Sequence, residues 1–445
     1  MHVEAAGTSE TPRTLAEMQV DWDAPDHVPA HLKVNLDWAL GNRPNDLVDA
    51  FEPVGWLAGP DVPPLLYQCR SPDGKIGSGG MVNQGWVVSH YDDINRVYSD
   101  NDHFSNAGQA EFQAVVGETF RTIPLAVDPP EHKKYRMFLM PFFSPARLNK
   151  MQDSIRNIVV EMIEGMADKG EIDIAWDFGR VYPVRIFMDL MKFPPDMFEQ
   201  FLEWEWNILH SGDMAKIQSS LREIIDYLKA FIAEKQRNPD DGLTSAIVNG
   251  QIEGRPLNDE EKIGIVWLLW LGGLDTVAAS IGLMFRRMAM DPVIQRQLAA
   301  DRSLIPGAIE EFLRLHPVVN SPRRAKFDFE WHGQLIRKGD AVCCNNAAGN
   351  YDPARFANPR QFDPTRHANR HFTFVAGVHI CLGAALARRE LRILLDEWFQ
   401  RMPEFKVKPG TDSSCYPGLL SVRHFHIAWD ASKVRYPEAE AIAAE

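Results

Sequence analysis

The feature that most constrains this chain is one cysteine in a glycine-containing loop, directly before an amphipathic helix. The segment HFTFVAGVHICLGAALARRELRILLDEWF carries Cys381 at this junction, and the helix is expected to begin near Leu382. The unpaired N–H groups and the positive end of the helix dipole stabilise a thiolate at such a position. The pattern therefore predicts a metal-binding thiolate. The alternative is that Cys381 is a small buried apolar residue.

The remaining cysteines and the net charge exclude several classes of protein. The chain has five cysteines in 445 residues and no zinc-type pairing, which predicts a reducing compartment without a disulfide framework. The formal net charge of -14 argues against a protein that coats nucleic acid or an anionic membrane. The sequence shows neither a secretory signal nor an apolar run long enough for a membrane span. We expect a soluble, cytoplasmic enzyme.

Apolar periodicity indicates a mainly helical fold with minor strands. Apolar residues recur at helical spacing from about Asp92 to Ser303. Alternating apolar residues between Phe327 and Ala347, and again near LLSVRHFHIAWD, favour small antiparallel sheets. With no internal repeat or linker, we expect one large domain at 27–435, an N-terminal arm at 1–26 and a C-terminal tail at 436–445.

A polar pair interrupts a long apolar helix upstream of the cysteine loop. In GIVWLLWLGGLDTVAASIGLMFRRMAMDP, Asp275 and Thr276 follow two glycines. The threonine hydroxyl can bond the carbonyl of Gly272, which loosens the helix and opens a local groove. A hydroxyl beside a carboxylate is also a suitable proton relay. The structural alternative is that Asp275 pairs with a neighbouring cation and Thr276 only bonds its own helix.

Together these motifs resemble those of the cytochrome P-450 family. The pattern F-x-x-G-x-H-x-C-x-G surrounds Cys381, GGLDT contains Asp275, and E-x-x-R provides Glu311 and Arg314. The resemblance extends from about His27 to the C-terminus and is closest to the soluble bacterial camphor-hydroxylase group. It implies the cytochrome P-450 fold, a mainly α single domain with small antiparallel β-sheets that encloses haem b, and Cys381 as the axial iron ligand.

The resemblance also implies roles for residues outside the ligand. Asp275, Thr276 and Gly272 match the family's acid-alcohol motif, and Glu311 with Arg314 matches its buried structural ion pair. Phe374 would cover one face of the sulfur, while Gly377 and Gly383 would let the backbone approach the macrocycle. The haem propionates need cationic or hydrogen-bonding partners. The expected partners are His132, Arg136, Arg323 and His379.

Three positions depart from the family pattern. Val375 stands where Gly, Ser, Asn or His is usual, so we expect a slightly altered loop and haem environment. Gln361 stands where an arginine normally completes the E-x-x-R triad, and Arg360 is one position off, which leaves the triad incomplete. Phe120 aligns with the tyrosine that hydrogen-bonds the ketone in camphor hydroxylases. A site without that hydroxyl should prefer an apolar guest.

The implied activity is hydroxylation of a small apolar substrate with dioxygen. We expect a terpenoid, norisoprenoid or aromatic compound, with camphor itself disfavoured. Core packing is an equally weighted alternative for each residue expected to line the substrate site. These residues are Phe112, Phe120, Leu125, Leu268, Val319 and Leu419.

The resemblance implies electron delivery by a [2Fe–2S] ferredoxin with a separate flavoprotein reductase, since the chain shows no nucleotide fingerprint of its own. A basic patch on the cysteine side of the haem would steer an acidic ferredoxin. Its expected members are His132, Lys133, Lys134, Arg136, Arg388, Arg389 and Arg392. Two rival functions are a peroxide-using or isomerising haem-thiolate enzyme and a non-catalytic haem protein that senses or carries a ligand.

Overall fold

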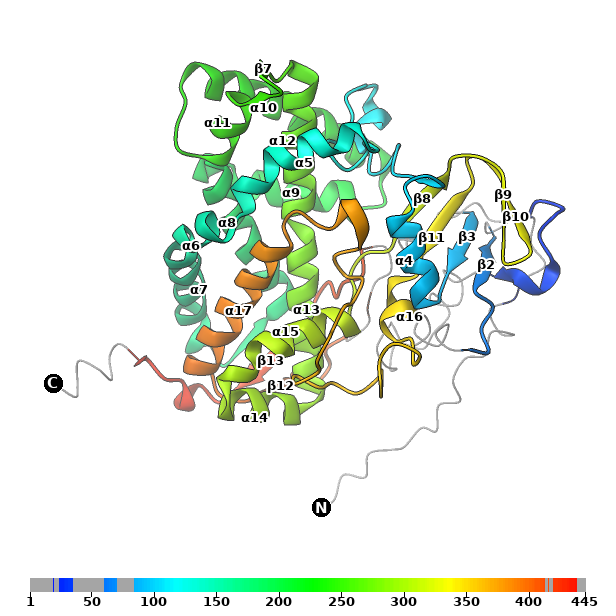
Figure 1. The fold of residues 1–445 in the computed structure, drawn as a ribbon. Helices are drawn as coiled ribbons and strands as arrows, with labels where there is room; N and C mark the ends of the chain where they lie inside the picture. The colour runs from blue at the N-terminus through cyan, green and yellow to red at the C-terminus, as the bar shows by residue number, and fades with distance from the viewer. Residues whose placement is uncertain are drawn as a thin grey trace.

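The computed structural model describes residues 19, 24–34, 60–69, 84–412, 415 and 419–437. The predicted arm at 1–26 and tail at 436–445 lie largely outside the described residues. Helices make up most of the described chain, as predicted from the apolar periodicity. Figure 1 shows them gathered into one large body, with the main sheet at its side.

The α-helices follow one another through most of the chain. They are α4 (Tyr91–Ser99), α5 (Glu131–Leu139), α6 (Pro145–Lys150), α7 (Gln152–Ala167), α8 (Val181–Met191), α9 (Phe198–Leu209), α10 (Met214–Arg237), α11 (Leu243–Val248), α12 (Asp259–Gly273), α13 (Asp275–Met290), α14 (Pro292–Ala300), α15 (Ile305–Leu315), α16 (Asn346–Asn350) and α17 (Ala384–Arg401). Side-chain caps fix several starts. Asn258 and Glu261 form a reciprocal capping box at α12, with both hydrogen bonds at 2.8 Å.

The strands are short. They are β1 (Lys33–Val34), β2 (Leu65–Gln68), β3 (Gly85–Val88), β4 (Phe104–Ser105), β5 (Glu171–Asp173), β6 (Gln251–Ile252), β7 (Arg255–Pro256), β8 (Ser321–Ala325), β9 (Phe329–Trp331), β10 (Gln334–Ile336), β11 (Ala341–Cys344), β12 (Phe405–Val407) and β13 (His426–Trp429). The β9–β10 and β6–β7 pairs and the β12–β13–β5 sheet are antiparallel, as predicted for small sheets.

The largest sheet differs from the antiparallel expectation. Its order is β1-β2-β3-β11-β8-β4, and β11 pairs with β3 in parallel while pairing with β8 in antiparallel. The two parallel neighbours lie far apart in the sequence and are joined through helices, a connection that permits parallel pairing. On β8, burial alternates along the strand, which places Ser321, Arg323 and Ala325 on the buried face.

Two apolar clusters of buried residues meet at the helix pair α12 and α13. One includes residues of α13, α15 and α17, and the other includes residues of α8, α9, α10 and α12. The segment Asp259–Met290 is long and apolar enough to cross a membrane by length and composition alone. Since 61% of its apolar window is buried inside the protein, packing within the core accounts for that composition.

Candidate active site

Cys381 lies between the short 3-10 helix η7 (Gly377–His379) and α17. Its backbone N–H donates to the carbonyl of Phe374 at 3.0 Å, which closes the loop. Burial raises the pKa of the Cys381 thiol, and backbone N–H groups of Gly383 and Ala384 act in the opposite direction. The residue is exposed to solvent although many protein atoms surround its thiol. N–H groups directed at the sulfur favour a thiolate ligand.

Two residues of the cysteine loop have left-handed backbone conformations. Gly377 has φ +70°, and a Cβ at that position would lie 2.2 Å from the carbonyl oxygen of Tyr98 at the end of α4. This close packing explains the glycine without any cofactor. Val375 has φ +53°, a conformation that is strained for a β-branched residue. At Gly383 a Cβ would make only an ordinary 3.9 Å contact with the sulfur of Cys381.

Four basic side chains from three elements gather near this loop. His132 and Arg136 lie one turn apart on α5, Arg323 comes from β8 and His379 from η7. The rings of His132 and His379 have centroids 4.2 Å apart. We call these four residues the basic cluster. The structure thus brings together the four residues that the sequence predicted as propionate partners.

No ion pair joins the basic cluster to a carboxylate within the described part of the chain, although the charge of Asp128 acts on His132, Arg323 and His379 from nearby. Arg323 is 3% exposed, and its guanidinium bonds the Ser321 hydroxyl at 2.8 Å and the Pro322 carbonyl at 2.9 Å. The Nε2 atom of His379 is buried without a hydrogen-bond partner among the described residues. Burial, followed by the charges of His132 and Arg323, lowers the pKa of His379 to about 3.

This arrangement fits a bound group with two carboxylates. Burial also lowers the pKa of Arg323. The protein environment alone therefore disfavours positive charge on the basic cluster. Buried cations are ordinarily paired, and the missing anion is most simply supplied by a ligand. The two propionates of haem have the required charge, and Cys381 supplies the thiolate that haem iron would bind.

The long apolar segment that contains α12 and α13 is interrupted where the sequence predicted weakened helical hydrogen bonding. α12 ends at Gly273 and α13 begins at Asp275. The Thr276 hydroxyl donates to the carbonyl of Gly272 at 3.3 Å. A Cβ at Gly273 would lie 2.6 Å from the ring of Phe187, whereas a Cβ at Gly272 would meet nothing within 4 Å. The interruption therefore leaves polar groups facing open space on the Gly272 side.

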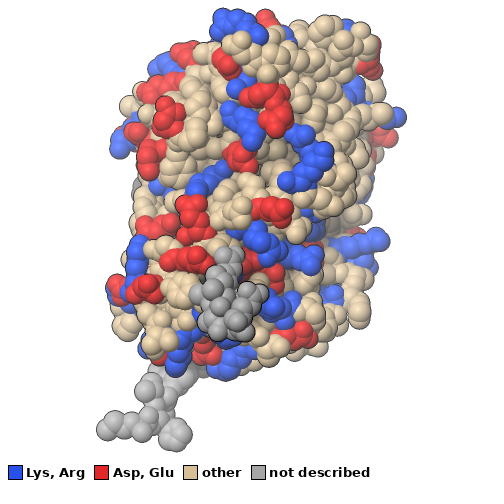
Figure 2. All heavy atoms as spheres, turned by 90° about the vertical axis from the view of Figure 1, so that its left-hand side faces the viewer, with Lys and Arg blue, Asp and Glu red and all other residues tan. Residues whose placement is uncertain are grey.

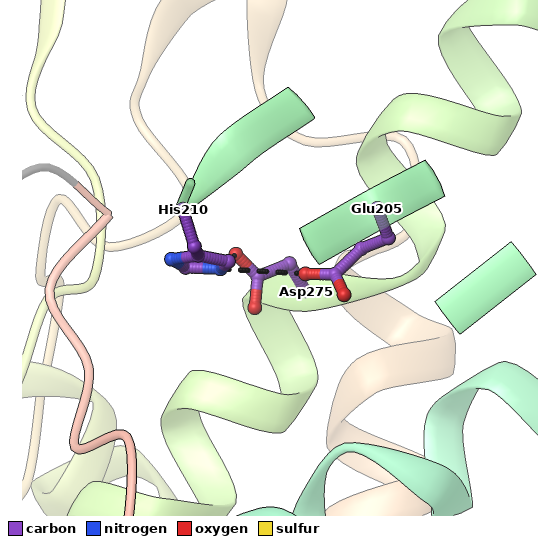
Figure 3. Close-up of side chains that lie close together, drawn as sticks. All are labelled: Glu205, His210 and Asp275. Atoms are coloured by element: carbon purple, nitrogen blue, oxygen red, sulfur yellow. Dashed lines mark hydrogen bonds and ion pairs between the residues drawn. The ribbon is translucent and has the colours of Figure 1, made fainter. Parts of the chain in front are cut away.

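Asp275 points to a histidine that the sequence did not single out (Figure 3). Its Oδ2 atom lies 2.8 Å from Nε2 of His210, the residue that caps the C-terminal end of α9. The same Nε2 lies 3.3 Å from Glu205, whose carboxylate also lies 3.4 Å from Nε of Arg180. The structural alternative, in which Asp275 pairs with a neighbouring cation, therefore agrees with the contact to His210. Residues from α9, α13 and the start of α8 thus form one buried polar group.

Glu205, His210 and Asp275 could in principle hold a metal ion, since their ligand atoms lie within 4.8 Å of one another. Hydrogen bonding already accounts for their approach. Burial lowers the pKa of His210, but the hydrogen bonds and charges of Asp275 and Glu205 outweigh it and raise the pKa to about 9. The imidazolium formed near neutral pH lies between two carboxylates, and Arg180 adds a second positive charge. This interpretation requires no metal.

The E-x-x-R pair forms the centre of a larger buried network. Nε of Arg314 lies 2.7 Å from Glu311, and both side chains are fully buried. Nε of Arg366 lies 3.0 Å from the same carboxylate, so the triad is complete and the sequence expectation was wrong. Gln361 contributes its backbone carbonyl, which accepts from Arg314 and Arg366. Arg366 lies four residues after Phe362, and the course of the loop brings its side chain back to Glu311. The spacing of the motif in the sequence did not indicate this contact.

The residues predicted to line the substrate site occupy different environments. Phe120 is 4% exposed and packs edge-on against Trp267, with ring centroids 6.5 Å apart. Core packing accounts for its environment. Phe112 is 36% exposed in the short helix η2 (Phe112–Val116). The partly buried members are Leu125, Leu268, Val319 and Leu419.

The predicted basic patch is smaller than expected. His132 is buried, with an exposed fraction of 3%, so it belongs to the basic cluster rather than to the surface. Arg388 forms two hydrogen bonds to Glu310, at 2.7 and 2.9 Å, and Lys134 lies 3.4 Å from Glu131. These carboxylates neutralise much of the charge that we assigned to the patch. Exposed members that remain are Lys133 and Arg392.

The surface on another side is also mixed in charge. Figure 2 shows the face that bears α6 and α7, where lysines and arginines are interspersed with aspartates and glutamates. Such a face lacks the single-sign field that steers an oppositely charged partner.

Comparisons with known proteins agree with this geometry. The family model described as Cytochrome P450 matches residues 77–417. "Probable cytochrome P450 127A1" of Sinorhizobium fredii is 32% identical over 409 residues, which cover 91% of this chain and 96% of the relative. "Cyclomarin C epoxidase CymV" of Salinispora arenicola is 30% identical over 362 residues, 78% of this chain and 91% of the relative.

A solved structure matches over nearly the whole chain. The crystal structure of CYP101J2 has a TM-score of 0.78 and 31% sequence identity to this protein. The match covers 92% of this chain and 99% of the solved one. The similarity therefore includes both the helical body and the cysteine loop.

Proposed function

The chain belongs to the cytochrome P450 family of haem-dependent monooxygenases, and on that premise we propose that it hydroxylates a compact apolar substrate. The proposed substrate class is a terpenoid, norisoprenoid or aromatic compound. The observation that carries the site assignment is the basic cluster, which lies beside Cys381, forms no ion pair with a described carboxylate and leaves Nε2 of His379 without a hydrogen bond among the described residues.

Cys381 is proposed as the axial ligand, and the basic cluster as the propionate site. A b-type haem, when bound, supplies the activation of dioxygen. Burial raises the pKa of the Cys381 thiol, and the N–H groups of Gly383 and Ala384 oppose this effect, so they favour the anionic sulfur that haem iron would bind. Arg323 and His379 would pair with propionate oxygens, which satisfies the buried Nε2 atom and neutralises the clustered charge.

Asp275 and Thr276 are proposed to deliver protons during oxygen activation. The Thr276 hydroxyl is held toward the open side of the helix by its hydrogen bond to Gly272. A hydroxyl held in this way can accept a proton from one neighbour and donate its own to a group on the open side of the helix. Asp275 directly precedes Thr276 and lies at the start of α13. Asp275 is therefore the acid that would return a proton to the Thr276 hydroxyl.

An apolar substrate is favoured by the side chains that we place around it. Phe120 packs in the core against Trp267 and has no hydroxyl where camphor hydroxylases carry a tyrosine. Leu125, Leu268, Val319 and Leu419 offer no hydrogen-bonding groups. A ketone would lose its water without gaining a partner from these residues. A compact hydrocarbon guest does not carry that cost.

We place the protein in the cytoplasm and assign electron delivery to a [2Fe–2S] ferredoxin with its own flavoprotein reductase. The net charge of -14 and the enclosed apolar helix support a soluble protein without a membrane or nucleic-acid partner. Lys133 on α5 and Arg392 on α17 are exposed cations. α17 begins shortly after Cys381, and α5 carries Arg136, whose charge acts on the Cys381 thiol. Lys133 and Arg392 offer a limited docking surface for an acidic carrier.

Reconstituted turnover tests this function. Small terpenoids are first screened for the spin-state change that follows displacement of iron-bound water. The best compound is then incubated with enzyme, ferredoxin, reductase and ¹⁸O₂. We expect a hydroxylated product that carries one ¹⁸O atom and depends on the ferredoxin. A product formed only with added peroxide, or no product at all, would contradict the proposal.

A further inference from the structure

The Asp275 side chain is mostly buried, so its contact with bulk water is small. The residue is 8% exposed, and among the described residues its side chain bonds one partner, Nε2 of His210 at 2.8 Å. If Asp275 supplies protons through Thr276, those protons must be replaced from outside. The nearest group able to carry them is His210.

One ring nitrogen of His210 faces buried carboxylates, and the other does not. Its Nε2 atom faces Asp275 and Glu205, as Figure 3 shows, while the side chain as a whole is 10% exposed. Its Nδ1 atom makes no hydrogen bond to a described residue. The ring lies against Trp206 with centroids 4.9 Å apart, which holds it in place beside α9. An imidazole with one nitrogen engaged and the other available is suited to carry protons.

The charges around His210 favour its protonated form. Asp275 approaches from α13 and Glu205 from α9, and Arg180 at the start of α8 balances Glu205. His210 also caps the C-terminal end of α9, where the helix dipole stabilises a cation. The raised pKa, about 9, means that the ring carries a transferable proton at neutral pH.

From this geometry we propose that His210 is the positioning residue and proton carrier for Asp275, an inference that rests on the proposed monooxygenase function. In each transfer the Nε2–H bond breaks and an O–H bond forms at Asp275, which leaves a neutral ring protonated at Nδ1. A hydronium ion from the solvent then returns a proton to Nε2, which restores the imidazolium and releases water.

A titration that needs no substrate tests the coupling. NMR of the ferrous carbon monoxide form, with histidines labelled at ¹³Cε1, gives the pKa of His210 in the holoenzyme. We expect a value well above 6.5 in the wild type and a fall toward 6.5 in Asp275→Asn, because the neighbouring negative charge is removed. A wild-type value at or below 6.5, or one unaffected by Asp275→Asn, would overturn the proposal.

A turnover measurement tests the transfer itself. His210→Gln keeps a hydrogen-bond donor but cannot titrate, so we expect product formation to slow about tenfold or more and its solvent isotope effect to increase. The decline of the wild-type rate above about pH 9 should vanish in the variant, while the carbon monoxide spectrum is retained. His424→Gln is the matched control, since that histidine is 55% exposed and bonds Asp173 instead.

Two outcomes separate this inference from the function on which it rests. An unchanged rate and isotope effect in His210→Gln, in an enzyme that does hydroxylate its substrate, would overturn the carrier role alone. Absence of hydroxylated product from the wild type would contradict the proposed function, and the NMR titration would still decide whether His210 and Asp275 are coupled.

Discussion

Nε of Arg366 lies 3.0 Å from Oε1 of Glu311, a carboxylate that is fully buried and already paired with Arg314. Two further donors reach Glu311, the backbone N–H of Asp363 at 3.0 Å and the side-chain amide of Asn369 at 2.8 Å. The carboxylate therefore joins α15 to the loop that leads into the cysteine segment. Removal of one cation from such a network leaves buried charge without full compensation.

Arg366→Ala should destabilise the folded enzyme by about 3–5 kcal/mol, because Glu311 stays buried with half of its cationic pairing. Denaturant unfolding of the holoenzyme measures the change. Arg370→Ala is the control, since Arg370 is exposed four residues further along the same loop. Equal stability of the two variants would show that Arg366 contributes little to the network.

Arg323→Leu should weaken haem retention by about tenfold or more, because a buried charge-assisted partner of a propionate is lost. Transfer of haem to an excess of apomyoglobin measures the release rate. Arg324→Leu is the matched control, since Arg324 is exposed on the opposite face of β8 and bonds the Gly339 carbonyl at 3.1 Å. If haem leaves both variants at the same rate, Arg323 is not a propionate partner.

Glu390 should make the protein less stable as the pH rises. Burial raises its pKa from 4.5 to about 8, and its Oε2 atom has no hydrogen-bond partner among the described residues. The unfolded chain ionises near pH 4.5 while the folded protein stays protonated, so the folded state binds more protons between those values. The contribution of Glu390 to stability is therefore fully present below about pH 4.5 and is lost as the pH rises to about 8.

Glu390→Gln should remove that slope. Over the window from pH 5 to 8, the wild type should lose up to about 1.4 kcal/mol per pH unit more than the variant. Chemical denaturation at several pH values measures the difference. Glu404→Gln, at a side chain that is 47% exposed, should retain the wild-type dependence. Parallel stability curves for wild type and Glu390→Gln would contradict the assignment.

Thr276→Ala should uncouple electron use from hydroxylation, since the hydroxyl that bonds Gly272 is lost from the open side of the helix. We expect haem and substrate binding to persist, while product per reductant falls about tenfold and peroxide release rises. Ser280→Ala is the control, because its hydroxyl bonds the Thr276 carbonyl at 2.8 Å one turn later. Unchanged coupling in Thr276→Ala would remove Thr276 from the relay.

Local sequence patterns were sufficient to predict the elements that lie close together along the chain. The helix after Cys381, the polar interruption before Thr276 and the Glu311–Arg314 pair each occupy a few consecutive turns. Periodicity and short spacings report such contacts directly. The predominance of helices follows from the same periodicity.

Contacts between distant segments could not be predicted in this way. His210 lies 65 residues before Asp275, and only the packing of α9 against the start of α13 brings them together. Arg366 reaches Glu311 through the path of a loop rather than through a motif position. The positive φ of Val375 had no local signal either, because β-branched residues ordinarily favour extended backbone.

The central claim is that Cys381 is the thiolate ligand of the haem iron. Its most direct test is the absorption spectrum of the reduced carbon monoxide complex of Cys381→Ser, compared with that of Cys415→Ser. A thiolate ligand gives this complex a strongly red-shifted band. We predict that the band is lost in Cys381→Ser and kept in Cys415→Ser. Survival of the band in Cys381→Ser would contradict the assignment.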